Sequence, residues 1–145
     1  GAAQTNTTVT LAGLTLRAGE SGTVQARIVC TAAGCGGFAV TVYFEPAIVQ
    51  VTRIAPGPYL GERVFVGEST IDNEAGSVRL VAAALGDPPA GTDGVLFEID
   101  ITALAEGMTG LNIAALEVAE DPARAGAASL SGAVAENSVG ASRIW

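Results

Sequence analysis

Histidine is absent from this chain of 145 residues, and lysine is absent as well. Without histidine, the chain lacks the commonest general base and the commonest metal ligand of proteins. Neither a Ser-His-Asp nor a Cys-His catalytic site can therefore be built from this sequence. Its two cysteines cannot supply the four ligands of a zinc site. We accordingly predict no catalytic residues and no metal site.

Basic residues are few, because seven arginines stand against 15 acidic residues and leave a net charge of −8. Proteins that bind nucleic acid show the opposite balance, and anionic membrane surfaces repel such a chain. No apolar run approaches the roughly 20 residues that a transmembrane helix needs. We therefore expect no nucleic-acid partner and no membrane insertion. This acidic composition fits a soluble extracellular protein.

Small and apolar residues are abundant. Hydrophobic residues make up 49% of the chain, aromatic residues only 5%, and there are 19 glycines. Many short strands joined by glycine turns use residues in this way. A chain of this length forms one domain and buries about 70% of its unfolded surface. We expect a single domain over residues 1–145, with residues 1–6 as a loose lead-in and residues 137–145 as a loose C-terminal end.

Apolar residues at every second position predict strands with one buried face. The clearest case is residues 38–44, in which Phe38, Val40 and Val42 alternate with less apolar or smaller neighbours. This strand ends at Glu45-Pro46, because proline cannot donate a ladder hydrogen bond. Further strands are predicted over residues 8–14, 23–30, 48–54, 64–71, 78–84, 95–101, 111–118 and 128–135.

Two of these strands are irregular. Residues 64–71 fit one short strand or two, and in residues 111–118 the apolar parity changes between Ile113 and Leu116. A β-bulge produces such a change. Strands at this spacing, separated by turn residues, predict an all-β fold, namely a nine-stranded β-sandwich with jelly-roll topology.

Cys30 and Cys35 flank a four-residue loop between the second and third predicted strands. In a secreted protein they would form a disulfide that closes this loop and stabilises the fold by roughly 2 kcal/mol. In a cytosolic protein they would be two free, buried thiols. A thioredoxin-like motif is excluded because it needs two intervening residues.

Carboxylates are the remaining candidates for chemistry. Glu98 and Asp100 point to the same outward side of a predicted strand, as the acid and base of a glycosidase would. No second cluster faces them, so we expect a solvated acidic face, with a patch that faces a partner as the alternative. Calcium prefers oxygen ligands in turns, but turn formation also accounts for the acids found there. These acids are Asp72, Glu74, Asp87 and Asp93.

Three features in this order resemble extracellular cohesin modules, the dockerin-binding receptors of cellulosome scaffoldins. A strand ends in Phe44-Glu45-Pro46, a proline–glycine turn occupies residues 55–58, and a strand with Leu96 opens after Gly94. The resemblance covers most of the chain. It implies a nine-stranded flattened jelly roll, similar in fold to a class of carbohydrate-binding modules.

The resemblance also implies a docking face built from the third, fifth, sixth and eighth strands. Tyr43 and Leu96 would be its anchors, with Glu98 at the rim. Cohesins of cellulosomes often carry Asn or Asp where this chain has Gly37 and Ala39, which favours a different class of partner or a cohesin from outside cellulosomes. Matched position by position, the partner-binding residues would be Gly37, Ala39, Thr41, Tyr43, Arg79, Val81, Ala83, Leu96 and Glu98.

We therefore expect a non-catalytic, extracellular protein-recognition module that binds a dockerin-type partner. It would need no cofactor of its own, and calcium would enter mainly through the partner. One alternative is a carbohydrate-binding module that binds polysaccharide, but only Tyr43 on a sheet and Tyr59 in a loop offer rings for sugar stacking. A structural or adhesin spacer without a ligand is the other alternative.

Overall fold

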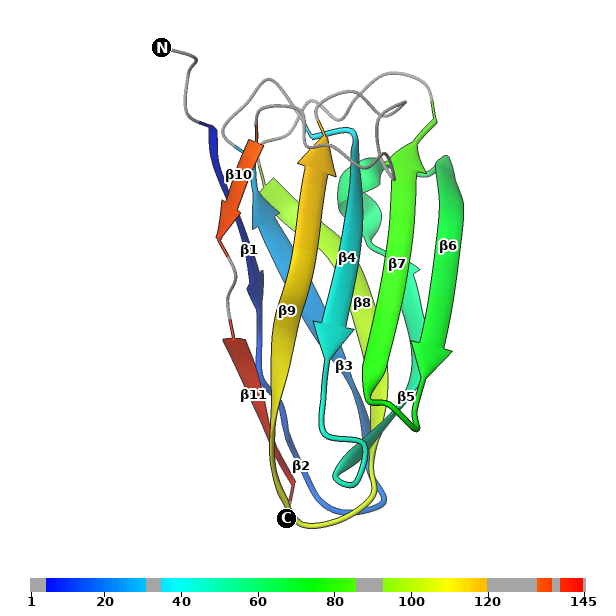
Figure 1. The fold of residues 1–145 in the computed structure, drawn as a ribbon, viewed down its shortest axis with the longest axis vertical. Coiled ribbons are helices and arrows are strands. Elements are labelled where there is room, and N and C mark those ends of the chain that lie inside the picture. Colours follow the sequence, from blue (N-terminus) through cyan, green and yellow to red (C-terminus); the bar gives the residue numbers. More distant parts are fainter. Residues whose placement is uncertain (1–4, 31–34, 86–92, 120–132, 137–138, 145) are drawn as a thin grey trace.

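The computed structural model describes residues 5–30, 35–85, 93–119, 133–136 and 139–144. These residues form two β-sheets packed face to face (Figure 1). The predicted all-β sandwich is confirmed. The predicted count of nine strands is not, because the described residues form eleven strands and one short 3-10 helix, η1 (Pro58–Leu60).

The sheet at the front of Figure 1, called the front sheet below, has the order β2-β11-β9-β4-β7-β6. The back sheet has the order β10-β1-β3-β8-β5. Consecutive strands lie in opposite sheets, except for β6 and β7, which are neighbours in the front sheet. Such crossings between two sheets are typical of a jelly roll. The front strands are β2 (Thr15–Leu16), β4 (Gly37–Tyr43), β6 (Val64–Asp72), β7 (Ser77–Ala84), β9 (Gly107–Ala119) and β11 (Val139–Ile144). The back strands are β1 (Thr5–Leu11), β3 (Ser21–Val29), β5 (Val49–Pro56), β8 (Asp93–Ala103) and β10 (Ala133–Glu136).

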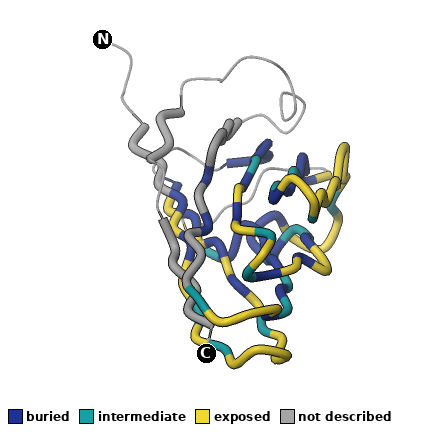
Figure 2. The backbone as a smooth tube through the Cα atoms, turned by 60° about the horizontal axis from the view of Figure 1, so that its bottom comes forward, coloured by how far each residue is buried: buried dark blue, intermediate teal, exposed yellow. Residues whose placement is uncertain are grey.

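The core lies between the two sheets, and the buried parts of the chain gather toward the middle of the molecule (Figure 2). Along β3, buried positions alternate with exposed ones. From the front sheet β4 contributes Phe38, whose ring stacks on Phe97 of β8 with the ring centroids 5.6 Å apart. Fully burying an apolar side chain of this size stabilises a fold by about 1.5–3 kcal/mol. The largest fully buried side chains are Phe38, Phe97, Ile28, Leu80, Leu96, Ile99, Ile101 and Leu111.

The bulge predicted in residues 111–118 is confirmed. In the β4–β9 ladder Thr41 pairs with Ala115 and Val42 pairs with Ile113, so β9 carries one extra residue between them. The extra residue shifts the face on which later residues of β9 lie. This explains why the apolar parity changes inside a single strand.

Residues 139–144 form strand β11, so the loose end expected at residues 137–145 is wrong for these six residues. Strand β11 pairs with β9 over six residues and runs parallel to β2. Strand β10 runs parallel to β1 from the pair Thr5–Ala133 to the pair Thr8–Glu136. At the other end β1 begins at Thr5, within the expected lead-in. Residues 120–132, where part of the last predicted strand fell, lie outside the described residues.

The turn predicted at residues 72–76 joins β6 to β7. Asp72 Oδ1 accepts hydrogen bonds from the backbone nitrogens of Glu74 and Ala75 at 3.1 and 2.9 Å. Gly76 has a φ of 78°, and a Cβ atom there would collide with the Phe44 carbonyl oxygen and the Pro46 ring. Glycine alone meets both conditions, because it has no Cβ and adopts positive φ readily.

Cys30 and Cys35 form a disulfide between the end of β3 and the start of β4, and both residues are buried. The bond therefore ties the back sheet to the front sheet at one end of the sandwich. No helix in the part of the chain that the structure describes is long and apolar enough to cross a membrane.

Candidate functional site

The outer surface of strands β4, β7 and β6, called the front face below, is the candidate site. Phe38, Val40 and Val42 point into the core, so the alternate residues of β4 point outward. Register then places partners from β7 and β6 on the same side. The front face comprises Gly37, Ala39, Thr41 and Tyr43 of β4, Ser77, Arg79, Val81 and Ala83 of β7, and Phe65, Glu68, Thr70 and Asp72 of β6.

Seven of the nine residues predicted to bind a partner lie together on the front face. These seven come from β4 and β7, which are hydrogen-bonded neighbours. Ala39, Val81 and Ala83 face outward and are nevertheless only 4%, 9% and 8% exposed. Tyr43 lies at one end of the face and is 53% exposed.

Leu96 and Glu98 do not lie on this face, so the expectation that they join it is wrong. Both belong to β8, which lies in the back sheet. In the β3–β8 ladder Ala26 pairs with Phe97 and Arg27 with Val95, which makes Leu96 the extra residue of a bulge. Its side chain is in the core and 1% exposed. Leu96 therefore cannot anchor a partner.

The resemblance assigned the fifth predicted strand, which is β6, to the docking face, but the predicted binding residues include none from this strand. The β6–β7 register shifts between Val66 and Glu68, so Gly67 is an extra residue in this edge strand. The bulge puts Phe65 and Glu68 on the same face although they are three residues apart. The signal was present in the sequence, since the alternation in residues 64–71 breaks at a glycine, as it does at many bulges.

Hydrogen bonds join three strands across the middle of the front face. Arg79 Nε donates to Glu68 Oε1 at 3.1 Å, and Arg79 Nη1 donates to Thr41 Oγ1 at 3.0 Å. The Thr70 hydroxyl donates to Glu68 Oε2 at 3.1 Å. An ion pair this exposed, with side chains 40% and 44% accessible, stabilises a fold by at most about 1 kcal/mol. The main effect of the ion pair is to fix the position of Arg79. Its guanidinium group is bonded to β6 on one side and to β4 on the other.

A hollow with a volume of about 270 Å³ opens on the front face between β6 and β7. Phe65 is its most prominent wall and is 58% exposed. Val81 and Ala83 also line it, and the Arg79–Glu68 pair borders it. The hollow therefore combines the apolar side chains of Phe65, Val81 and Ala83 with a polar part of the lining that includes one matched pair of charges.

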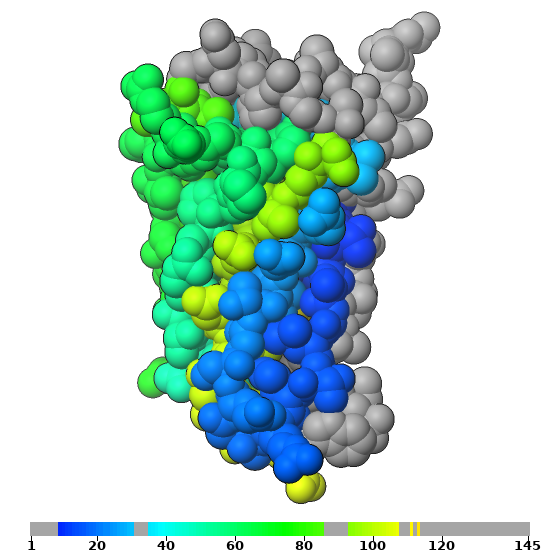
Figure 3. Space-filling view, turned by 180° about the vertical axis from the view of Figure 1, so that it is seen from behind, coloured from blue at the N-terminus to red at the C-terminus, as the bar shows by residue number. Residues whose placement is uncertain are grey.

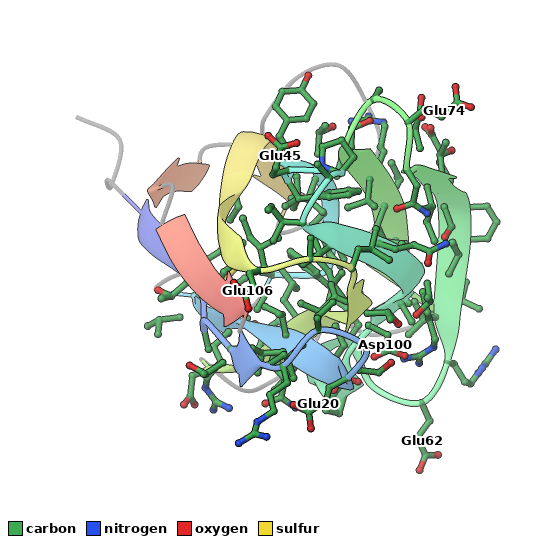
Figure 4. All side chains as sticks on the ribbon, turned by 90° about the horizontal axis from the view of Figure 1, so that it is seen from below. Glu20, Glu45, Glu62, Glu74, Asp100 and Glu106 are labelled. Atoms are coloured by element: carbon green, nitrogen blue, oxygen red, sulfur yellow. A yellow bond between two sulfur atoms is a disulfide. The ribbon has the colours of Figure 1, made fainter. Side chains whose placement is uncertain are left out.

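The end of the front face at Tyr43 is acidic. Tyr43 is opposite Ser77 of β7, which pairs in turn with Asp72 of β6. Seen from below, Glu45 and Glu74 lie on the front-sheet side, whereas Asp100 and Glu20 lie on the back-sheet side (Figure 4). The front face thus has an aromatic and acidic end, a hydrogen-bonded middle and an apolar end.

Solved structures match the chain over nearly its whole length, whereas no protein-family model and no curated protein matches it. A chain of a type I cohesin–dockerin complex from Clostridium thermocellum gives a TM-score of 0.74 at 12% identity, covering 100% of this chain and 98% of that one. A non-cellulosomal cohesin from the archaeon Archaeoglobus fulgidus gives 0.70 at 15% identity, covering 97% and 91%. The chain has the cohesin fold.

A third cohesin gives the same result. It is a cohesin module of a family 33 glycoside hydrolase from Clostridium perfringens, with a TM-score of 0.68 at 17% identity, covering 97% of this chain and 96% of that one. The resemblance to cohesins expected from the sequence is therefore confirmed for the fold. At such identities the agreement concerns the arrangement of strands rather than individual side chains.

The opposite surface of this cohesin fold, the outer side of the back sheet, carries polar pairs across its strands. Strands β3, β8 and β5 lie side by side on it (Figure 3). The Thr23 hydroxyl donates to Asp100 Oδ1 at 2.8 Å, and Arg53 Nη1 donates to Asp100 Oδ2 at 3.3 Å. Gln25 Nε2 donates to Glu98 Oε2 at 3.1 Å. Both carboxylates that suggested acid–base chemistry thus hydrogen-bond to their neighbours on adjacent strands.

Acidic residues do not assemble a metal site among the described residues. No group of three or more Cys, His, Asp or Glu side chains comes together there. Asp72 caps a turn through backbone nitrogens, as the turn interpretation of this residue predicted. Asp93 is the first residue of β8, and Asp87 lies outside the described residues.

Tyr59, expected in a loop, lies in η1 and is only 8% exposed. Its hydroxyl oxygen accepts a hydrogen bond from the backbone nitrogen of Cys35 at 3.3 Å. Burial raises the pKa of the Tyr59 phenol, the Cys35 hydrogen bond opposes this rise, and the charge of Asp93 adds to it. A ring in this position packs inside the cohesin fold and cannot stack on a sugar.

Proposed function

We propose that the chain is a non-catalytic recognition module that binds a dockerin-type protein through its front face. One observation carries the proposal. The four strands that the cohesin resemblance assigns to docking, the third, fifth, sixth and eighth predicted strands, correspond to β4, β6, β7 and β9. These four are neighbours in one sheet, in the order β9-β4-β7-β6. Solved structures with this fold include cohesin–dockerin complexes.

The front face has the composition of a protein interface. Interfaces combine an apolar centre with aromatic and arginine side chains that dominate the binding energy. Tyr43 and Phe65 are the exposed aromatic side chains among the described residues of this face. Arg79 lies between them and is held in place by Glu68 and Thr41. These three side chains are therefore the residues on which binding should depend most.

The location of the module and its need for cofactors follow from the same proposal. A disulfide between Cys30 and Cys35 persists in oxidising environments, such as the outside of the cell. We therefore propose an extracellular location. The chain requires no cofactor, and calcium takes part through the dockerin-type partner. No catalytic step is assigned to the chain.

Polysaccharide binding receives less support. A planar sugar-binding face needs two or three aligned, exposed aromatic rings. Tyr43 and Phe65 lie six residues apart in register along the sheet, a separation of roughly 20 Å at 3.4 Å per residue. The buried Tyr59 does not extend this set.

The proposal is tested by calorimetry of the purified chain with the dockerins of the solved cohesin–dockerin complexes, with calcium and after its removal by chelation. We expect one-to-one binding that requires calcium. Tyr43→Ala should weaken binding at least tenfold, about 1.4 kcal/mol, because the ring loses its contact with the partner.

The matched control is Val29→Ala, which removes an exposed apolar side chain of the back sheet and should leave affinity unchanged. If the chain binds insoluble polysaccharide but no dockerin, the proposed function is wrong. If Val29→Ala and Tyr43→Ala weaken dockerin binding equally, the face has been misassigned.

A further inference from the structure

The hollow between β6 and β7 exists because Gly67 has no side chain. Gly67 is the bulge residue of the edge strand β6. A Cβ atom at this position would lie 3.4 Å from Phe65 Cε2 and 3.5 Å from Val81 Cγ1, which are ordinary van der Waals distances. The space above Gly67 therefore accepts carbon atoms between two apolar side chains without a collision.

The charges that line the hollow also determine which side chains of a partner can enter it favourably. Arg79 and Glu68, the charged residues that line it, are 3.1 Å apart and neutralise each other. A cationic or anionic side chain would lose its hydration there and find no unpaired counter-ion, which is unfavourable. An uncharged aliphatic side chain would instead remove the apolar surface of Phe65, Val81 and Ala83 from water. The paired charges thus point to an uncharged occupant, and the side chains of Phe65, Val81 and Ala83 favour an aliphatic one.

At the apolar end of the front face, away from Tyr43, β4 offers much less to a partner than β6 does. Gly37 has no side chain, and Ala39 is only 4% exposed. These are the positions at which cohesins of cellulosomes often carry Asn or Asp. On the β6 side, Phe65 is 58% exposed and borders the hollow. At this end of the front face, the surface available for contact is therefore displaced from β4 toward β6.

We propose that the dockerin-type partner inserts one uncharged aliphatic side chain into the hollow above Gly67, so that contact is centred on β6 and β7. This inference rests on the proposed function, and it names the chemistry that the partner must present. Phe65 forms one wall of the subsite, and Val81 and Ala83 line it. Discrimination between partners then depends on the size and charge of a single side chain of the partner.

The first test fills the hollow. Gly67→Leu places a side chain where the partner's side chain should enter, and Gly67→Ala fills the same space only in part. We expect at least tenfold weaker dockerin binding by calorimetry for Gly67→Leu and an intermediate loss for Gly67→Ala. Phe65→Ser should also weaken binding, whereas Leu104→Ser, at a 50% exposed residue in the turn after β8, should leave affinity unchanged. Thermal unfolding of each variant verifies that it is folded.

The second test needs no dockerin. Methyl resonances of Val81 and Ala83 are followed by NMR during titration with 3-methylbutan-1-ol, 3-methylbutylammonium and 3-methylbutanoate. The neutral alcohol should shift these resonances most, and Gly67→Leu should abolish the shifts. Equal shifts with all three probes, or shifts that persist in Gly67→Leu, would overturn the inference.

The two tests separate the inference from the function on which it rests. If the chain binds a dockerin and Gly67→Leu binds it equally well, the inference is wrong while the proposed function stands. If the chain binds no dockerin, the proposed function is wrong, and the probe titration alone decides the chemistry of the hollow.

Discussion

Single residues in this chain connect parts of the fold that are distant in sequence. Tyr59 is one example, because it lies in η1 and its hydroxyl receives the backbone N–H of Cys35, next to the disulfide. A buried tyrosine hydroxyl usually finds such a partner. The phenol is neutral in the folded state, and burial raises its pKa above the ordinary value.

This raised pKa gives a prediction for the dependence of stability on pH. A group whose pKa is higher in the folded state contributes stability below its unfolded pKa, here about 10. That contribution is lost as pH rises through the folded pKa, because the unfolded chain releases its proton first. The chain contains no lysine, so few other side chains titrate in this range.

Tyr59→Phe should therefore reduce the loss of stability between pH 9 and 11, measured by urea unfolding across that range. At neutral pH the variant should be less stable by about 0.5–1.5 kcal/mol, since it lacks the hydrogen bond to Cys35. Tyr43→Phe, at an exposed position, is the control and should keep the alkaline loss. Identical pH profiles for Tyr59→Phe and the unmodified chain would refute this assignment.

At the scale of the elements, Asn73 joins the β6–β7 turn to the back sheet. Its Oδ1 accepts the backbone N–H of Val51 at 2.8 Å, and its Nδ2 donates to the Val51 carbonyl oxygen at 2.9 Å. Strand β5, which contains Val51, is an edge strand. The side-chain amide thus forms the two hydrogen bonds that a residue of a neighbouring strand would form with Val51. Unpaired N–H and C=O groups of an edge strand can pair with another chain, and Asn73 prevents this at Val51.

Asn73→Ala should lower the free energy of unfolding by about 1–3 kcal/mol, because the N–H and the carbonyl oxygen of Val51 both lose their hydrogen-bond partner. Asn73→Asp should also be destabilising, since a carboxylate would face the Val51 carbonyl oxygen. Both are measured by urea unfolding at neutral pH. The control is Glu74→Ala in the same turn, an exposed position, which should change stability by less than about 0.5 kcal/mol. Equal stabilities of Asn73→Ala and the control would contradict the bridging role.

The strands also differ in how well the sequence predicts them. Alternation located β3, β4, β7 and β8 because the side-chain period of a strand is a local property. It also located the bulge in β9, since the change of parity is visible in the residues themselves. Strand β6 was ambiguous because the bulge at Gly67 interrupts a strand that, as an exposed edge, has little apolar pattern to begin with.

For the whole molecule, the C-terminal segment completes both sheets. Strand β10 extends the back sheet by pairing with β1, and β11 extends the front sheet by pairing with β9. The loose end predicted for residues 137–145 does not hold for residues 139–144, a strand whose sequence contains too few alternating apolar side chains to indicate it. Strand pairing there depends on backbone hydrogen bonds to partners far away in the chain.

Removing residues 133–145 should therefore destabilise the whole domain rather than one end of it. The truncation removes the four residues of β10 and the six of β11, and it exposes the edges of β1 and β9. Domains of this size are stable by only about 5–15 kcal/mol, so the urea midpoint should fall markedly. An unchanged midpoint would show that both strands are dispensable.

What the sequence determined by itself is the local pattern. It indicated which residues turn inward, where turns interrupt the strands, and that the fold is an all-β sandwich. What only the tertiary structure decided is the assignment of strands to sheets. Leu96 and Glu98 resemble residues of the front face in their local pattern, yet β8 lies in the back sheet. The physical reason is that alternation depends on the geometry of one strand, whereas strand neighbours depend on the packing of the whole core.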